Sequence, residues 1–137
     1  MKRFATPALL YAVLALAGGV FYREFTKFQD FSGQTTLSVL HTHYFLLGMV
    51  VFLLLLLLEK SFSFATPKTG RVLVVYHLGL NLTTLMLLVR GIVQVLALPL
   101  SAAANGALSG VAGIGHLLLG VSLILLLVQI RAAAQRD

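Results

Sequence analysis

Apolar residues gather along this chain into four long runs, at residues 5–22, 37–58, 72–98 and 107–130. Each run has roughly 18 to 27 residues, which in helical form is enough to cross the hydrocarbon core of a bilayer, about 30 Å thick. Inside a bilayer the backbone amide and carbonyl groups must bond within their own segment, so each run is expected to form a helix. The pattern therefore predicts an all-α protein with four transmembrane helices.

Short polar segments separate the runs and contain residues that begin or interrupt helices. Pro7 suits the first turn of the first helix, and Thr35 and Thr36 suit the N-cap of the second. Pro67 and Pro99 lie in the next two breaks. Because the connections are short, we expect an up-down bundle in which the second and fourth helices are diagonal partners. The whole chain then forms a single four-helix transmembrane domain.

The composition supports a membrane location. Of the 137 residues 59% are hydrophobic and 10% are charged, whereas a soluble domain carries roughly 25% charged residues. The lipid bilayer is therefore the expected surroundings of the chain. There is no cysteine, which excludes disulfides and thiolate metal sites. A glycine-rich phosphate loop is also missing, and nothing in the pattern indicates a hydrolytic or phosphoryl-transfer site.

The net charge of +6 is distributed unevenly across the predicted membrane. Arg23 and Lys27 fall on one side, where Glu24 and Asp30 offset them. The other side holds seven basic residues: Lys2, Arg3, Lys60, Lys68, Arg71, Arg131 and Arg136. Basic residues are enriched in cytoplasmic loops, so both termini are predicted to be cytoplasmic (N-in/C-in). The charge thus indicates the topology of a multi-pass bacterial inner (plasma) membrane protein, and no nucleic acid is expected as a partner.

Four phenylalanines recur at helical spacing near the first connection. Phe21, Phe25, Phe28 and Phe31 are separated by four, three and three residues, which puts their rings on one helical face. We expect a short amphipathic helix that lies in the outer headgroup region. A lid over an outward-facing site is the alternative.

Several ionisable or polar residues lie within the predicted spans, where they are costly and are by default candidates for function. They are His41, His43, His77, His116, Asn81 and Arg90. Counted from the inner ends at 1.5 Å per residue, His43 lies about 24 Å up the second helix and His116 about 22 Å up the fourth. Two histidines at one level on two helices can supply both axial ligands of a heme. The sequence therefore suggests a heme b site in the outer half of the bilayer.

Glycines beside these histidines bear on the choice of ligand. Gly113 and Gly120 share the face of His116 and leave room for a flat ring, whereas Gly106 and Gly110 fit close helix packing better. His41 is also a candidate ligand, because Gly48 lies seven residues away on its face. Residues two apart on a helix point about 200° apart, so His41 and His43 cannot both face one small site. Depth favours His43 as the partner of His116.

Two further groups have weaker assignments. Arg90 lies near the outer edge, where it either reaches the headgroups or pairs with heme propionates through its planar fork of donors. His77 lies near the inner surface, and either forms a hydrogen bond there or joins Asn81, one turn further in, in a pocket for a quinone headgroup. A lone His–Asn pair carries little specificity.

Three segments resemble a known family. They are HTHYFLLGMVVFLLLLLLEK, VYHLGLNLTTLMLLVRGI and GIGHLLLGVSLILLL, which together cover most of the last three helices. They resemble a family of small bacterial four-helix membrane proteins of unknown function. The H-x-H pattern at His41 and His43, with His116 on another helix, also resembles a reduced relative of the heme–copper oxidase superfamily and its nitric-oxide-response membrane proteins. That resemblance implies heme b, but the chain has four helices instead of twelve and too few histidines for a separate three-histidine copper site.

Three functions are therefore considered. The first is a heme b protein for electron transfer or diatomic gas binding. The second is a transition-metal binder or transporter for copper, zinc or a similar ion, with His41, His43 and His116 as ligands. The third is an accessory structural subunit whose histidines only satisfy polar packing. The partners considered are lipid, a quinone, an electron-transfer protein and a second copy of the chain in a homo-oligomer.

Overall fold

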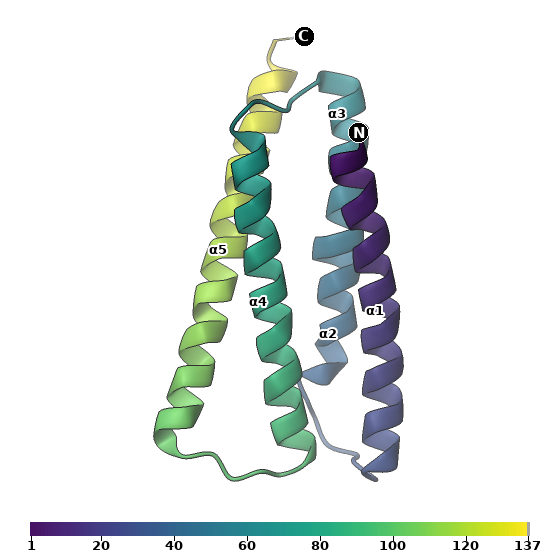
Figure 1. Cartoon of the computed structure of the whole chain (residues 1–137), viewed down its shortest axis with the longest axis vertical. Coiled ribbons are helices and arrows are strands. Elements are labelled where there is room, and N and C mark those ends of the chain that lie inside the picture. The colour runs from purple at the N-terminus through teal and green to yellow at the C-terminus, as the bar shows by residue number, and fades with distance from the viewer. Residues whose placement is uncertain (137) are drawn as a thin grey trace.

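The protein, seen here as a computed structural model that describes residues 1–136, is a bundle of four long helical rods joined by three short connections (Figure 1). The rods are α1 (Lys2–Phe28), a second span made of α2 (Leu37–His43), the π-helix η1 (Tyr44–Val50) and α3 (Val51–Phe62), then α4 (Thr69–Val95) and α5 (Ala102–Ala134). Each rod is long and apolar enough to cross a membrane. The predicted all-α fold with four membrane-spanning helices is confirmed.

The rods form two antiparallel hairpins that lie side by side. α1 packs along the second span, and α4 packs along α5 (Figure 1). The hairpins meet where α2 touches α4 and where α3 touches α5. The second and fourth spans are therefore in direct contact, and the expected diagonal relation between them is wrong. Both termini lie at one end of the bundle, here called the terminal end, and the connections 29–36 and 96–101 lie at the far end (Figure 1).

Close approach between α4 and α5 depends on two glycines. A Cβ atom on Gly79 would lie 2.5 Å from the backbone nitrogen of Leu119. A Cβ on Gly115 would lie 2.8 Å from the hydroxyl oxygen of Thr83 and 2.9 Å from its backbone nitrogen. Only a residue without a side chain allows the two backbones to come this close.

The glycines that the sequence favoured for packing do not take part in it. A Cβ on Gly106 or Gly110 would meet nothing within 4 Å. α5 touches α4 with a different face, the one that contains Gly115. Close packing, which suited the spacing of Gly106 and Gly110 better than a heme site did, is not found at either glycine within residues 1–136, because spacing alone does not identify the face that meets a neighbour.

Side-chain hydroxyls join the second span to α4 at the far end. Thr36 donates from its hydroxyl to the carbonyl of Leu87 at 2.7 Å, and Thr35 donates to the carbonyl of Gly91 at 3.1 Å. Thr36 is the N-cap residue of α2, but its side chain makes no capping hydrogen bond. These threonines therefore connect the second span to α4. The sequence predicted only that they would cap the second helix.

The first helix is longer than its apolar run. α1 continues without a break to Phe28, and the rings of Phe21 and Phe25 stack with centroids 5.1 Å apart. The separate amphipathic helix expected in the first connection is wrong, because no proline or glycine follows Gly19 to stop α1 before Phe28. Phe31 lies in the connection that follows.

Most of the apolar surface points outward. Only 17% to 33% of an 18-residue apolar stretch in each of the four rods is buried inside the bundle, and many leucines and valines are exposed on its outer faces. A soluble monomer rarely exposes contiguous apolar surface on this scale. The chain is therefore a multi-pass membrane protein.

Candidate functional site

The two histidines of the H-x-H pattern face different helices. His41 lies against α1, where a Cβ on Gly19 would be 3.7 Å from the Cβ of His41. Its Nδ1 atom is buried and has no hydrogen-bond partner in the part of the chain that the structure describes. His43 lies on the other side of α2 and faces α5. This divergence agrees with the angle of about 200° expected between residues two apart on a helix.

His43 and His116, called here the histidine pair, come together between α2 and α5. Their ring centroids are 6.4 Å apart and their planes are nearly perpendicular, at 88°. Nδ1 of His43 bonds to the carbonyl of Val39 at 2.8 Å, and Nδ1 of His116 bonds to the carbonyl of Ala112 at 2.9 Å. Because a carbonyl only accepts, each Nδ1 carries the hydrogen and each Nε2 keeps a free lone pair. This is the tautomer of a metal-binding histidine.

The space beside the histidine pair is open on α5. A Cβ on Gly113 or Gly120 would meet nothing within 4 Å, and His116 itself is exposed between them. Gly48 is different, since its Cβ would lie 2.5 Å from the Cβ of Tyr11. Gly48 therefore brings the second span close to α1. The room for a cofactor that the sequence suggested beside His41 is filled by Tyr11.

Arg90 bridges α4 and α5 at the far end. Its guanidinium donates to the hydroxyl of Ser109 at 2.8 Å and to the side-chain oxygen of Asn105 at 3.3 Å. Ser109 precedes His116 by seven residues, which places it on the same helical face about 10 Å away. A cavity of about 650 Å³ lies beside Arg90 and Asn105. The two expected roles of Arg90, as a headgroup anchor and as a propionate partner, both remain predictions.

A second polar group lies on the opposite side of the second span, nearer the terminal end. We call Tyr11, Tyr44, His77 and Asn81 the tyrosine–histidine cluster. Tyr44 donates to Oδ1 of Asn81 at 3.3 Å, and Nδ2 of Asn81 donates to the hydroxyl of Tyr11 at 3.1 Å. The hydroxyl of Tyr11 bonds to Nδ1 of His77 at 2.6 Å. The sequence identified His77 and Asn81, and the structure adds two tyrosines to them.

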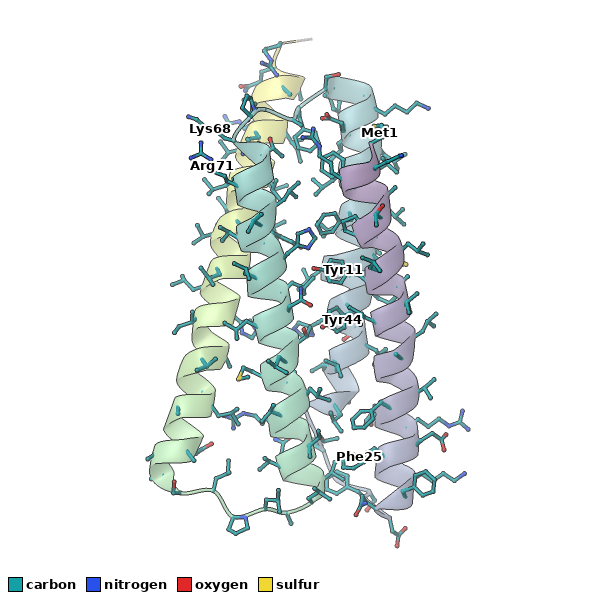
Figure 2. The ribbon with its side chains drawn as sticks, in the orientation of Figure 1. Met1, Tyr11, Phe25, Tyr44, Lys68 and Arg71 are labelled. Carbon is teal, nitrogen blue, oxygen red and sulfur yellow. The ribbon has the colours of Figure 1, made fainter. Side chains whose placement is uncertain are left out.

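Aromatic rings pack around this cluster. The ring of Tyr11 stacks on those of Tyr44 and His77, with centroids 5.7 Å and 5.6 Å apart. The ring of Phe52 stacks on His77 at 4.8 Å with an interplanar angle of 15°. Figure 2 shows Tyr11 and Tyr44 near mid-height of the bundle, between α4 and the hairpin that contains α1. A search for polar groups within the apolar runs finds both tyrosines, but only the fold shows that they meet.

The π-helix η1 lies between the two sites. It begins at Tyr44, directly after His43, and ends at Val50. Tyr76 on α4 donates from its hydroxyl to the carbonyl of Leu47 within it, at 2.7 Å. Short π-helical segments within α-helices occur frequently at functional sites. The hydrophobic pattern of the second span contains no signal for this change of helix type.

The three histidines expected to bind a transition metal together are not assembled as a set. Within residues 1–136, no group of three or more histidine, cysteine or acidic side chains is arranged to hold a metal ion. His43 and His116 meet, while His41 faces α1. The geometry therefore provides two imidazoles with ring centroids 6.4 Å apart and no third ligand from the described residues.

Comparisons with other proteins add a family assignment. No curated protein and no solved structure was found to be similar to this chain. These comparisons therefore give no support to a relation with the heme–copper oxidases. One family profile does match, over residues 1–133, and it covers all four spans. The chain belongs to that family, which is described as Protein of unknown function (DUF2871).

Proposed function

We propose that this protein binds heme b in the bacterial inner membrane, with His43 and His116 as the two axial ligands. The observation that carries the proposal is the separation of the two ring centroids, 6.4 Å. A metal ion bonded at about 2.0 Å to imidazole nitrogens on its opposite sides holds the two ring centroids roughly 6 Å apart. Ligands at a tetrahedral angle bring the centroids closer together. The separation therefore favours one metal between two opposed histidines, as in a bis-histidine heme.

The hydrogen bonds of the histidine pair support the same assignment. Each Nδ1 is bonded to a carbonyl of its own helix, so the orientation of each ring is fixed and Nε2 is the atom left to bind iron. A neutral imidazole is also less costly to place in a bilayer than a charged side chain. Gly113 and Gly120 leave the adjoining face of α5 free of side chains.

Heme bound by two histidines supplies one-electron redox chemistry. Two histidine ligands would leave no iron position free for a gas, so we favour electron transfer over diatomic gas binding. Arg90 retains guanidinium hydrogens beyond those given to Asn105 and Ser109, and these suit carboxylates such as propionates. The proposal keeps the heme b implied by the resemblance to heme–copper oxidases, without a copper site.

The test is the visible spectrum of protein purified in detergent from heme-sufficient cells, oxidised and then reduced with dithionite. We expect the sharp bands of a six-coordinate low-spin b-type heme. His116→Ala and His43→Ala should each remove most of the heme. His77→Ala and His41→Ala are the matched controls and should retain it. Circular dichroism should show that all four variants keep the helical content of the wild type.

Two results would contradict the proposal. A colourless wild-type protein would reject heme and would leave the transition-metal and structural functions, which metal analysis of the same sample separates. Loss of heme in His41→Ala with retention in His43→Ala would show that the wrong histidine of the H-x-H pattern had been chosen.

A further inference from the structure

A groove runs between α1 and α4, on the side of the second span away from the histidine pair. One cavity of about 640 Å³ is lined by α1, α2, α4 and Tyr44, and a second of about 390 Å³ is lined by α1 and α4 alone. The two cavities share Leu14 and Asn81 in their walls, so they adjoin, and together they are called here the α1–α4 groove. It lies between two membrane-spanning helices, so a molecule dissolved in the bilayer can enter it from the side.

The two parts of the groove differ in chemistry. The larger part is almost entirely apolar, with leucines from three helices that include Leu14, Leu40, Leu85 and Leu88. The smaller part, toward the terminal end, is lined by the polar residues Tyr11, His77 and Asn81 together with Pro7, Leu10 and Leu14. An occupant that matches both parts has a long apolar tail and a head with hydrogen-bonding groups.

The hydrogen bonds of the tyrosine–histidine cluster leave groups to receive that head. Both hydrogens of the Asn81 amide are used, by the hydroxyl of Tyr11 and by the carbonyl of His77. The hydroxyl of Tyr11 accepts from Asn81, so its own hydrogen is available to Nδ1 of His77, and in that arrangement Nε2 of His77 carries a hydrogen. Nε2 has no partner among residues 1–136, and the bond from Tyr44 to Asn81 is long, at 3.3 Å. One donor is thus unused and a second, on Tyr44, is weakly engaged.

From these features we propose that the α1–α4 groove binds a quinone or quinol of the membrane. A flat ring with carbonyl or hydroxyl groups fits beside the stacked rings of Tyr11, Tyr44 and His77 and accepts from the donors of the cluster. Its isoprenoid tail fills the leucine-lined part. A phospholipid acyl chain fits the apolar part equally well but leaves the polar part unused, and an unpaired polar group in lipid is costly. This inference stands apart from the heme proposal, because the two sites share no residue.

The experiment measures binding of a short-chain ubiquinone and a short-chain menaquinone to the full-length protein in lipid nanodiscs. The chain has four tyrosines and no tryptophan, so quinone binding can be followed by quenching of tyrosine fluorescence. We expect saturable binding of at least one quinone. Tyr44→Phe removes one hydroxyl and keeps the ring, and should lower the affinity about tenfold, the loss expected for one hydrogen bond in a buried site. Tyr22→Phe, outside the groove, is the matched control and should bind like the wild type.

A second pair of variants tests the groove without changing the cluster. Leu14→Trp adds bulk where the two cavities adjoin and should abolish binding. Leu9→Trp places the same side chain on an exposed face of α1 that lines neither cavity, and should leave binding unchanged. Because a new tryptophan would dominate the fluorescence, binding to both tryptophan variants is measured as the quinone retained by protein-containing nanodiscs beyond empty ones. His116→Ala should also bind quinone normally, which separates this proposal from the heme proposal. Binding that is not saturable in the wild type, binding that is equal in both tryptophan variants, or extraction of phospholipid that quinone fails to displace would each overturn the inference.

Discussion

Two glycines two residues apart on α5 provide a direct test of how α4 and α5 are held together. A Cβ on Gly115 would lie 2.9 Å from the backbone nitrogen of Thr83 and 3.3 Å from the backbone carbon of Leu82, whereas a Cβ on Gly113 would meet nothing within 4 Å. Backbone atoms cannot rotate away as a flexible side chain can. Gly115→Ala should therefore force the two helices apart by at least about 0.5 Å to restore an ordinary contact.

Overpacking of this kind costs typically about 1 to 3 kcal/mol. Gly113→Ala adds the same methyl group to open space and should change stability by less than about 1 kcal/mol, in the stabilising direction, because alanine is the better helix former. The free energies of unfolding are to be compared by titrating each variant in mixed micelles with a denaturing detergent while helical circular dichroism is recorded. Equal stability of the two variants would refute the close contact of α4 with α5 at Gly115.

Two further predictions concern the topology and the far end. Cysteines introduced at Ala65 and Ser32 should differ toward an impermeant thiol reagent in intact cells, with only Ser32→Cys labelled; the opposite pattern would overturn the cytoplasmic location of the termini. Arg90→Leu should lower the midpoint potential of the bound heme in a redox titration and weaken heme retention, since a nearby positive charge favours the reduced form. An unchanged potential with full occupancy would leave Arg90 as a link between α4 and α5 through Asn105 and Ser109.

Much of the fold was predictable because the bilayer imposes strong rules on length and apolarity. The four runs at 5–22, 37–58, 72–98 and 107–130 all coincide with helical rods of the structure. The ends were less predictable. α1 extends to Phe28 because hydropathy marks where lipid begins, whereas a helix ends only where its backbone or caps require it.

The candidate site was predictable in part. Counting along the second and fourth spans placed His43 and His116 at one depth, and the structure brings their rings together. The counting worked because helix rise is constant. A different argument, that Gly48 shares the face of His41 and leaves room beside it, failed, because Gly48 meets Tyr11. Depth is a property of one helix, whereas the face that meets a neighbour depends on how both helices are rotated.

By itself the sequence determined that this protein is helical, that it crosses a membrane four times, and which polar residues lie within the spans. These properties follow from hydropathy and chain length, which act locally. Only the tertiary structure decided that Gly115 and Gly79 bring α4 against α5, that η1 interrupts the second span, and that Tyr11 joins the cluster around His77. Each of these depends on the rotation and register of one rod against another. Lipid is as apolar as the leucines that it covers, so hydropathy cannot select the faces that meet, and close packing and hydrogen bonds between the rods select them instead.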